Sequence, residues 1–330
     1  MPERRTSRSR RPARVAGAPA ATALPEGPVR IATGWAEVRR SPDDPRAVTL
    51  HVNGVPSSHL DLDDATWLEF EYMQHMAAII EHTTDTPLDA VHLGAAGCAL
   101  PRWLDAVRPG SRQVAVDVDA VLLEHVRGWF GLPRAPRLRL RPGEAREVLA
   151  AMPTASADLV VRDVFAPDVT PAHLTTVEFL EEVVRVLRPG GLYLANCADR
   201  PPLAVARAEA ATVRAVLDDA LLVAEPGQLR GRRYGNLVLA GRAPSAPGPR
   251  GVGSRDGNGS GSTAGRGASR SRTPGAGRQH VGPDGLARRL RTLPVPAAVL
   301  QDDELAAFAG TAPPLRDAAP EVRTDTDEHS

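Results

Sequence analysis

The sequence contains no lysine, very little cysteine and no long apolar run. Its 40 basic residues balance its 40 acidic ones, so the net charge gives no indication of a nucleic-acid partner. No run reaches the roughly 18 apolar residues that a membrane-spanning helix requires. The Arg-rich start also lacks the apolar core of a secretory signal. We therefore expect a cytoplasmic protein without membrane association, and nucleic acid is not an expected partner.

The two cysteines, Cys98 and Cys197, lie far apart and form no CxxC motif. This excludes a disulfide scaffold and a zinc site built on paired cysteines. No His, Cys and Asp spacing suggests another metal site, so we expect no metal. Each cysteine is interpreted as a small buried hydrophobic residue rather than a nucleophile.

Shifts in amino-acid composition divide the chain into segments. Its overall hydrophobic content of 42% is enough for an ordinary core. Segments rich in Gly, Ser, Arg and Pro cannot bury enough apolar surface to order themselves, whereas an apolar stripe near the C-terminus must be covered. The predicted organisation is a disordered Arg-rich tail (1–27), a small β-hairpin subdomain (28–66), an entry helix and main domain (67–242), a disordered linker (243–283), a C-terminal segment packing on the domain (284–318) and an acidic disordered tail (319–330).

The main domain alternates strand and helix patterns. Predicted strands at 90–93, 113–118, 137–140, 158–161 and 191–197 are each followed by a predicted helix, which is typical of a parallel sheet covered on both faces. Two further strands, at 221–224 and 236–240, are separated by turn residues only and predict a terminal antiparallel hairpin. The predicted fold class is thus α/β, a Rossmann-like domain with a mostly parallel seven-stranded sheet.

The first two of these strands end in residues suited to a nucleoside. Gly94, Ala95 and Gly97 follow the first strand and would let the backbone approach a ligand closely, although small residues also serve tight strand–helix packing. The second strand ends in Asp117 about 20 residues later, where a ribose-binding carboxylate belongs. Val118 follows as a further cofactor contact, and Asp119 is expected to cap the next helix.

The third and fourth strands add two more acids. Glu144 could accept a hydrogen bond from an adenine amino group while the backbone N–H of Ala145 meets a ring nitrogen; alternatively, Glu144 only favours the helix N-terminus electrostatically. Asp163 follows the fourth strand, over the reactive end of such a ligand. Because the carboxyl ends of parallel strands share one sheet edge, these acids predict a binding site for an adenosyl cofactor.

Several motifs between about residues 30 and 242 then point to one family. They are the β-hairpin start, Glu71-Tyr72, the Val116-Asp117-Val118-Asp119 strand, Gly143-Glu144-Ala145, Asp158 with Asp163 and Pro167, and Leu187-Arg188-Pro189-Gly190-Gly191. In these the chain resembles the spermidine synthase family of polyamine aminopropyltransferases, as a divergent member with a class I S-adenosylmethionine-dependent methyltransferase-like fold.

The resemblance implies a role in polyamine biosynthesis. It implies aminopropyl transfer from decarboxylated S-adenosylmethionine to an amine, with Asp163 as general base and Tyr72 orienting the amine. It also implies a homodimer. The family usually has an acid in the glycine loop, where Gly97 stands, and a second Asp at the position of Ala166, for which nearby Asp168 is a candidate substitute as a substrate contact.

These departures leave two alternatives open. Without the glycine-loop acid, nothing in that loop repels the carboxylate of intact S-adenosylmethionine, so a methyltransferase with an unknown acceptor is the second hypothesis. The third is a catalytically degenerate nucleoside-binding or interaction module that kept the fold and lost the amine pocket.

Overall fold

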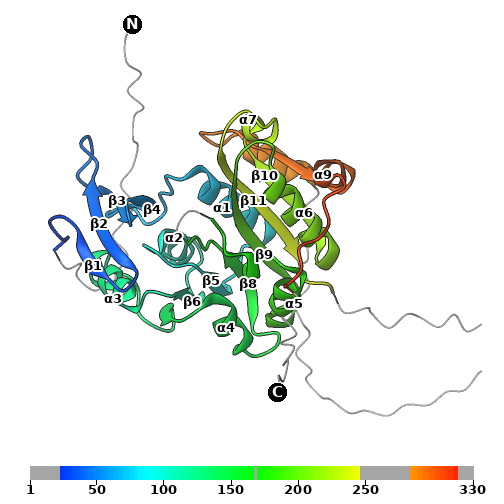
Figure 1. Cartoon of the computed structure of the whole chain (residues 1–330). Coiled ribbons are helices and arrows are strands. Elements are labelled where there is room, and N and C mark those ends of the chain that lie inside the picture. The colour runs from blue at the N-terminus through cyan, green and yellow to red at the C-terminus, as the bar shows by residue number, and fades with distance from the viewer. Residues whose placement is uncertain (1–22, 167–168, 246–282, 319–330) are drawn as a thin grey trace, which may run out of the picture.

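The computed structural model describes residues 23–166, 169–245 and 283–318. A small antiparallel sheet near the N-terminus stands beside a larger sheet that has helices on both faces (Figure 1). This arrangement confirms the predicted α/β, Rossmann-like fold with a preceding β-hairpin subdomain. The tails predicted at 1–27 and 319–330 and the linker predicted at 243–283 lie mostly outside the described residues.

The N-terminal sheet has four strands in sequence order. Asn53 and Gly54 have positive φ angles of 51° and 82° and form the tight turn of its third hairpin, between the third and fourth strands. One face is apolar and buried, with Leu50 fully covered. The sheet is fixed to the main domain by Asp119, whose Oδ2 accepts hydrogen bonds from the backbone N and Oγ1 of Thr33 at 2.7 and 2.8 Å. The strands are β1 (Val29–Ile31), β2 (Gly34–Arg40), β3 (Ala47–Val52) and β4 (Val55–Asp61).

The large sheet has the order β12-β10-β11-β9-β8-β5-β6-β7. The five strands from β9 to β7 are parallel, and β11, β10 and β12 continue the sheet antiparallel. The bounds are β5 (Asp89–Leu93), β6 (Arg112–Asp117), β7 (Leu138–Pro142), β8 (Ala157–Arg162), β9 (Leu187–Asp199), β10 (Asp218–Ala224), β11 (Gly235–Arg242) and β12 (Ala298–Gln301).

The sheet thus has one strand more than the seven predicted. The additional strand, β12, belongs to the C-terminal segment and pairs antiparallel with β10 at the sheet edge. Its four residues are too short a pattern to predict a strand alone, because the pairing that makes them one comes from a distant part of the chain.

Helices cover both faces of the large sheet. α1 (Glu71–Thr83), α2 (Ala99–Val107) and α3 (Ala120–Trp129) pack on one face, and α4 (Ala145–Ala150), α5 (Val177–Val186) and α6 (Ala204–Val216) on the other. In the C-terminal segment, α8 (Pro283–Arg291) packs on α1, and α9 (Asp302–Ala309) on α6. A short 3-10 helix, η1 (Ala172–Leu174), precedes α5, and α7 (Pro226–Leu229) lies between β10 and β11, where only turns were expected. Within the described residues, no helix has the length and apolarity needed to span a membrane.

The chain order reverses between β5 and β8, which lie side by side. The carboxyl ends of these strands therefore border the crevice where ligands bind in open α/β sheets. The two ends are in direct contact, since the backbone N–H of Asp163 donates to the carbonyl of Leu93 at 2.8 Å. At Gly94 (φ +88°), a Cβ would lie 2.0 Å from the carbonyl oxygen of Asp163, so only glycine fits there.

Candidate active site

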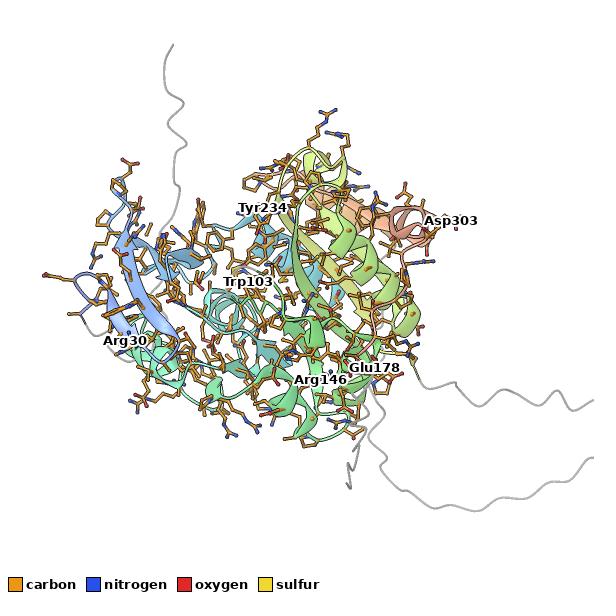
Figure 2. The ribbon with its side chains drawn as sticks, in the orientation of Figure 1. Arg30, Trp103, Arg146, Glu178, Tyr234 and Asp303 are labelled. Carbon is orange, nitrogen blue, oxygen red and sulfur yellow. The ribbon has the colours of Figure 1, made fainter. Side chains whose placement is uncertain are left out.

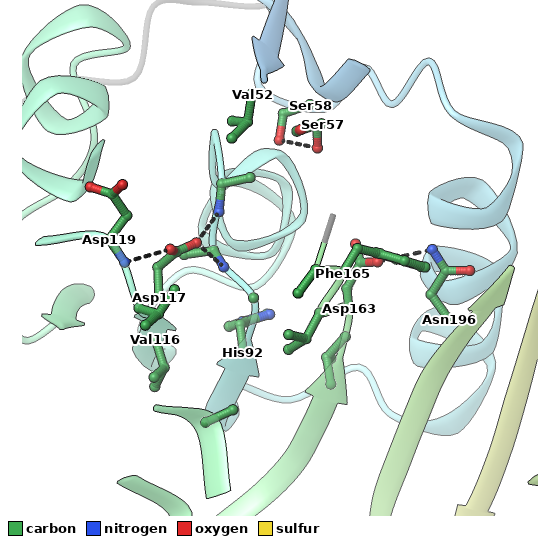
Figure 3. A pocket seen from close by; sticks show the side chains of 18 of the residues that line it. Val52, Ser57, Ser58, His92, Val116, Asp117, Asp119, Asp163, Phe165 and Asn196 are labelled. Atoms are coloured by element: carbon green, nitrogen blue, oxygen red, sulfur yellow. Dashed lines mark hydrogen bonds between the residues drawn. The ribbon is translucent and has the colours of Figure 1, made fainter. Parts of the chain in front are cut away.

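A cavity of about 880 Å³ opens at the carboxyl ends of the parallel strands. Its wall is built from the N-terminal sheet, α1, the glycine loop, the ends of β6 to β9, η1 and the start of β11 (Figure 3). Four carboxylates line it, those of Asp117, Asp119, Glu144 and Asp163, and no arginine does so in the described part of the chain. Its potential therefore favours a cationic ligand.

Asp117, at the end of β6, is held by the glycine loop that follows β5. Its Oδ2 accepts hydrogen bonds from the backbone N–H groups of Ala95 and Ala96 at 3.3 and 3.1 Å, and its Oδ1 from that of Asp119 at 3.0 Å. Burial raises the pKa of Asp117, although these bonds oppose the shift. A carboxylate has about four acceptor positions, so Oδ1 keeps room for one further donor, such as a single ribose hydroxyl.

Most of the other predicted cofactor residues line the cavity too. Gly94, Ala95, Ala145 and Val118 do so, and Val118 is 66% exposed. Gly97 is different, because the loop packs against β4 at this point. Its N–H donates to Ser58 Oγ at 2.9 Å, and a Cβ on Gly97 would lie only 2.7 Å from Ser58 Cβ. The structure thus places Gly97 against Ser58 and not at the cavity surface.

Glu144 is the N-cap of α4. Its Oε2 accepts from the backbone N–H of Glu147 at 2.9 Å, and its Oε1 lies 3.0 Å from Nε2 of His173. Burial raises the pKa of Glu144, but the hydrogen bonds from His173 and the backbone outweigh it, so the pKa lies below its ordinary value. Glu144 and His173 together line one side of the cavity.

Asp163 faces the cavity between two donors from different elements. Its Oδ2 accepts from the Tyr72 hydroxyl on α1, and its Oδ1 from Nδ2 of Asn196 on β9, both at 2.9 Å. Burial raises the pKa of Asp163 above its ordinary value despite these two hydrogen bonds. Burial and the charge of Asp163 also raise the pKa of Tyr72, so the phenol stays protonated and donates. The arrangement is a carboxylate with both oxygens oriented and an elevated proton affinity.

The opposite face of β8 carries a buried ion pair next to Asp163. Arg162 is fully buried and donates to Glu209 of α6 and to the Tyr193 hydroxyl of β9. Its positive charge partly opposes the upward shift of the Asp163 pKa. The end of β8 is therefore fixed from both faces of the sheet.

Asn196 and His173 were not predicted from the sequence. Asn196 is an amide in a strand of apolar residues, a departure that could have singled it out. His173 carried no comparable signal, since its partner Glu144 lies in another element. Asp168, the predicted substrate contact, lies outside the described residues, and Ala166 lines the cavity without a carboxylate.

The cysteines are not equipped as nucleophiles. Both are buried, and burial raises the pKa of Cys98 to about 12 and that of Cys197 well above its ordinary value. His92 also lines the cavity, but burial lowers its pKa to about 4, so its imidazole is neutral. Among the described residues, no group of three or more potential ligands is arranged to hold a metal ion.

Comparison with known proteins identifies the family. No family model matches the chain. A crystal structure of a probable spermidine synthase from Corynebacterium glutamicum is 32% identical to it, with a TM-score of 0.74, over 92% of this chain and 99% of that one. The chain belongs to the spermidine synthase family. This confirms the predicted resemblance.

Among curated proteins, this spermidine synthase family member is similar both to polyamine aminopropyltransferases and to methyltransferases. A polyamine aminopropyltransferase of Chromobacterium violaceum is 27% identical over 146 residues, 42% of this chain and 53% of that protein. An eEF1A lysine and N-terminal methyltransferase of Danio rerio is 26% identical over 121 residues, 34% of this chain and 18% of that protein. The chain spans about half the length of the first of these and less of the second.

Proposed function

We propose that this protein transfers an aminopropyl group from decarboxylated S-adenosylmethionine to an amine, with Asp163 as general base. The observation that carries the proposal is the Asp163 carboxylate, which faces a negatively charged cavity and is held by Tyr72 and Asn196. A sulfonium and an ammonium are both cations, so one carboxylate between them stabilises both.

The cavity's size and its hydrogen-bond acceptors suit a nucleoside. Its volume of about 880 Å³ lies within the range of about 300–1,000 Å³ usual for small-molecule sites. Asp117 would accept a ribose hydroxyl on its remaining acceptor position. Val118 and Ala145 would contact the adenine, with Glu144 near its amino group.

Asp163 would perform the proton transfer. The attacking amine must lose a proton as its nitrogen bonds to the aminopropyl carbon. The bond from that carbon to sulfur breaks, and its electron pair leaves with methylthioadenosine. The raised pKa of Asp163 makes it a better proton acceptor near neutral pH than an ordinary aspartate. Tyr72 donates to the carboxylate, and the lone pairs of its oxygen can accept a hydrogen bond from the amine.

Methyl transfer from intact S-adenosylmethionine is the second candidate. Gly97 favours it, because this position contributes no carboxylate and its space is filled by Ser58. The family usually has an acid at this position, and such an acid would repel the carboxylate of intact S-adenosylmethionine.

Calorimetry on the purified full chain distinguishes aminopropyl transfer from methyl transfer. We expect decarboxylated S-adenosylmethionine to bind at least about tenfold more tightly than the intact form, a difference of about 1.4 kcal/mol. An amine panel should then release methylthioadenosine, detected by mass spectrometry. A tenfold preference for intact S-adenosylmethionine would defeat the aminopropyl proposal, and no turnover with any amine would favour a binding module.

A further inference from the structure

The C-terminal residues 311–318, here called the C-terminal strap, return to the cavity side of the molecule. After α9 the strap runs along α6 to the start of α5 (Figure 1). The carbonyl of Leu315 accepts from the backbone N–H of Val177 at 2.9 Å, and its N–H donates to Thr212 Oγ1 at 2.8 Å. The strap is thus pinned between the first turn of α5 and the side of α6.

Asp317 of the strap binds two elements beside the cavity. Nη1 and Nη2 of Arg146 on α4 donate to its Oδ1 and Oδ2 at 2.8 and 2.6 Å, and Thr176 Oγ1, at the N-cap of α5, donates to Oδ1 at 2.8 Å. The Arg146 guanidinium holds the pKa of Asp317 below its usual value. Its backbone N–H donates to Glu178 at 3.0 Å, and Glu178 lies beside Arg146 in Figure 2. Such a two-pronged Arg–carboxylate pair fixes orientation as well as position.

Arg146 carries this constraint on to the cavity wall. Its Nη1 also donates to the carbonyl of His173 in η1 at 3.1 Å. The ring of His173 is hydrogen-bonded to Glu144, and both side chains line the cavity. A continuous series of contacts therefore runs from Asp317 through Arg146 and His173 to Glu144.

The pair at the cavity needs this support. The side chains of His173 and Glu144 are 48% and 35% exposed, and exposed polar contacts add little stability by themselves. Arg146 is a long, flexible side chain that pays a large entropy cost on being ordered, and Asp317 is the carboxylate that orders it. Without Asp317, Arg146 would keep its hydrogen bond to the carbonyl of His173 but lose the two-pronged carboxylate contact that fixes its orientation.

We propose that Asp317 is a positioning residue of the cosubstrate site: through Arg146 it holds Glu144 and His173 in place at the adenine side of the cavity. The identity of the ligand rests on the function proposed above. The strap would preorganise the site without touching the ligand, so its loss weakens binding and leaves the fold intact.

The test compares Asp317→Asn with Asp303→Asn in the full chain. Asp303 is an exposed carboxylate on α9, in the same C-terminal segment, and serves as the matched control. We expect Asp317→Asn to lower the affinity for 5′-methylthioadenosine about fivefold or more, the usual lower range of coupling between sites, and Asp303→Asn to leave it unchanged. Without ligand, hydrogen exchange at residues 144–148 and 172–176 should be faster in Asp317→Asn than in the wild type, and unchanged in Asp303→Asn.

A double-mutant cycle identifies the route. Arg146→Gln should reproduce both effects, and adding Asp317→Asn to it should change neither further, because the two side chains act through one contact. Unchanged exchange in Asp317→Asn overturns the inference whether or not the nucleoside binds. If the wild-type protein binds no adenosine ligand, the proposed function fails, and the exchange comparison still decides the role of the strap.

Discussion

At the residue scale, the chemistry of Asp163 depends on burial and on neighbours from two other elements, α1 and β9. The hydroxyl of Tyr72 and the amide of Asn196 favour its charged form, whereas burial favours its neutral form and prevails. A carboxylate held in this balance is oriented and ready to accept a proton. Its location directly after β8 is encoded locally, but its proton affinity is a property of the packed site.

Replacing Asp163 with Asn should abolish this proton acceptor. We expect turnover at saturating cosubstrate to fall by about 10²–10⁴-fold, the usual contribution of a general base, in addition to weaker binding of the cationic cosubstrate. In the unmodified protein, the rate of methylthioadenosine release should fall as the pH drops through the raised pKa of Asp163, because the protonated carboxyl cannot accept. Thermal unfolding controls for misfolding. A variant that keeps most of its turnover would exclude Asp163 as the base.

The two cysteines should be unreactive in the folded protein. Cys98 and Cys197 are at most 1% exposed, and the pKa of each is raised, so at pH 8 neither is a thiolate. We expect iodoacetamide to label neither in native protein and both in denatured protein, as measured by intact mass. Rapid native labelling of Cys98 would show that the glycine loop opens.

At the element scale, the glycine loop and the end of β8 pack without space for a side chain. The contact occurs at Gly94, where a Cβ would meet the backbone of Asp163, which cannot rotate away. The close approach brings the ends of β5 and β8 together at the floor of the cavity. Gly54 has a similar φ of 82° but nothing within 4 Å of its would-be Cβ.

Comparing Gly94→Ala with Gly54→Ala therefore separates steric overlap from backbone strain. Both substitutions place alanine at a positive φ, and only the first adds a clash. We expect Gly94→Ala to lower the free energy of unfolding by about 1–3 kcal/mol more than Gly54→Ala, as overpacked sites do. Urea unfolding measures both. Equal losses would mean that the strand ends move apart at little cost.

At the scale of the whole molecule, the C-terminal segment completes the domain. β12 covers the edge of β10, α8 covers α1, and α9 covers α6, with Leu290 and Leu305 fully buried. An uncovered edge strand is a template for association. The segment therefore covers β10 with a short new edge strand, in addition to the support of the cavity wall that we propose. The predicted homodimer and cytoplasmic location stay predictions.

A chain ending at residue 245 should be unstable and prone to aggregate. Leu290 and Leu305 contribute about 1.5–3 kcal/mol each by burial. Since about 1 kcal/mol shifts the melting temperature of a domain this size by about 2–4 °C, we expect a decrease of about 10 °C or more, with aggregation visible by light scattering. A chain ending at residue 318 is the control and should match the full chain. Equal behaviour of the two truncations would contradict a structural role for the segment.

The sequence by itself determined the order of strands and helices, the acids at the strand ends and the family. It also determined that Asp119 caps α3, where its Oδ1 accepts from the backbone N–H of Leu122 at 2.8 Å. These features are local, because periodicity and capping depend on residues close together in the chain. Only the tertiary structure decided that Asn196 and Tyr72 meet at Asp163, that Ser58 fills the space at Gly97, that β12 joins the sheet and that Asp317 supports Arg146. Each of those contacts joins residues far apart in sequence, and no local pattern encodes a partner that only folding brings near.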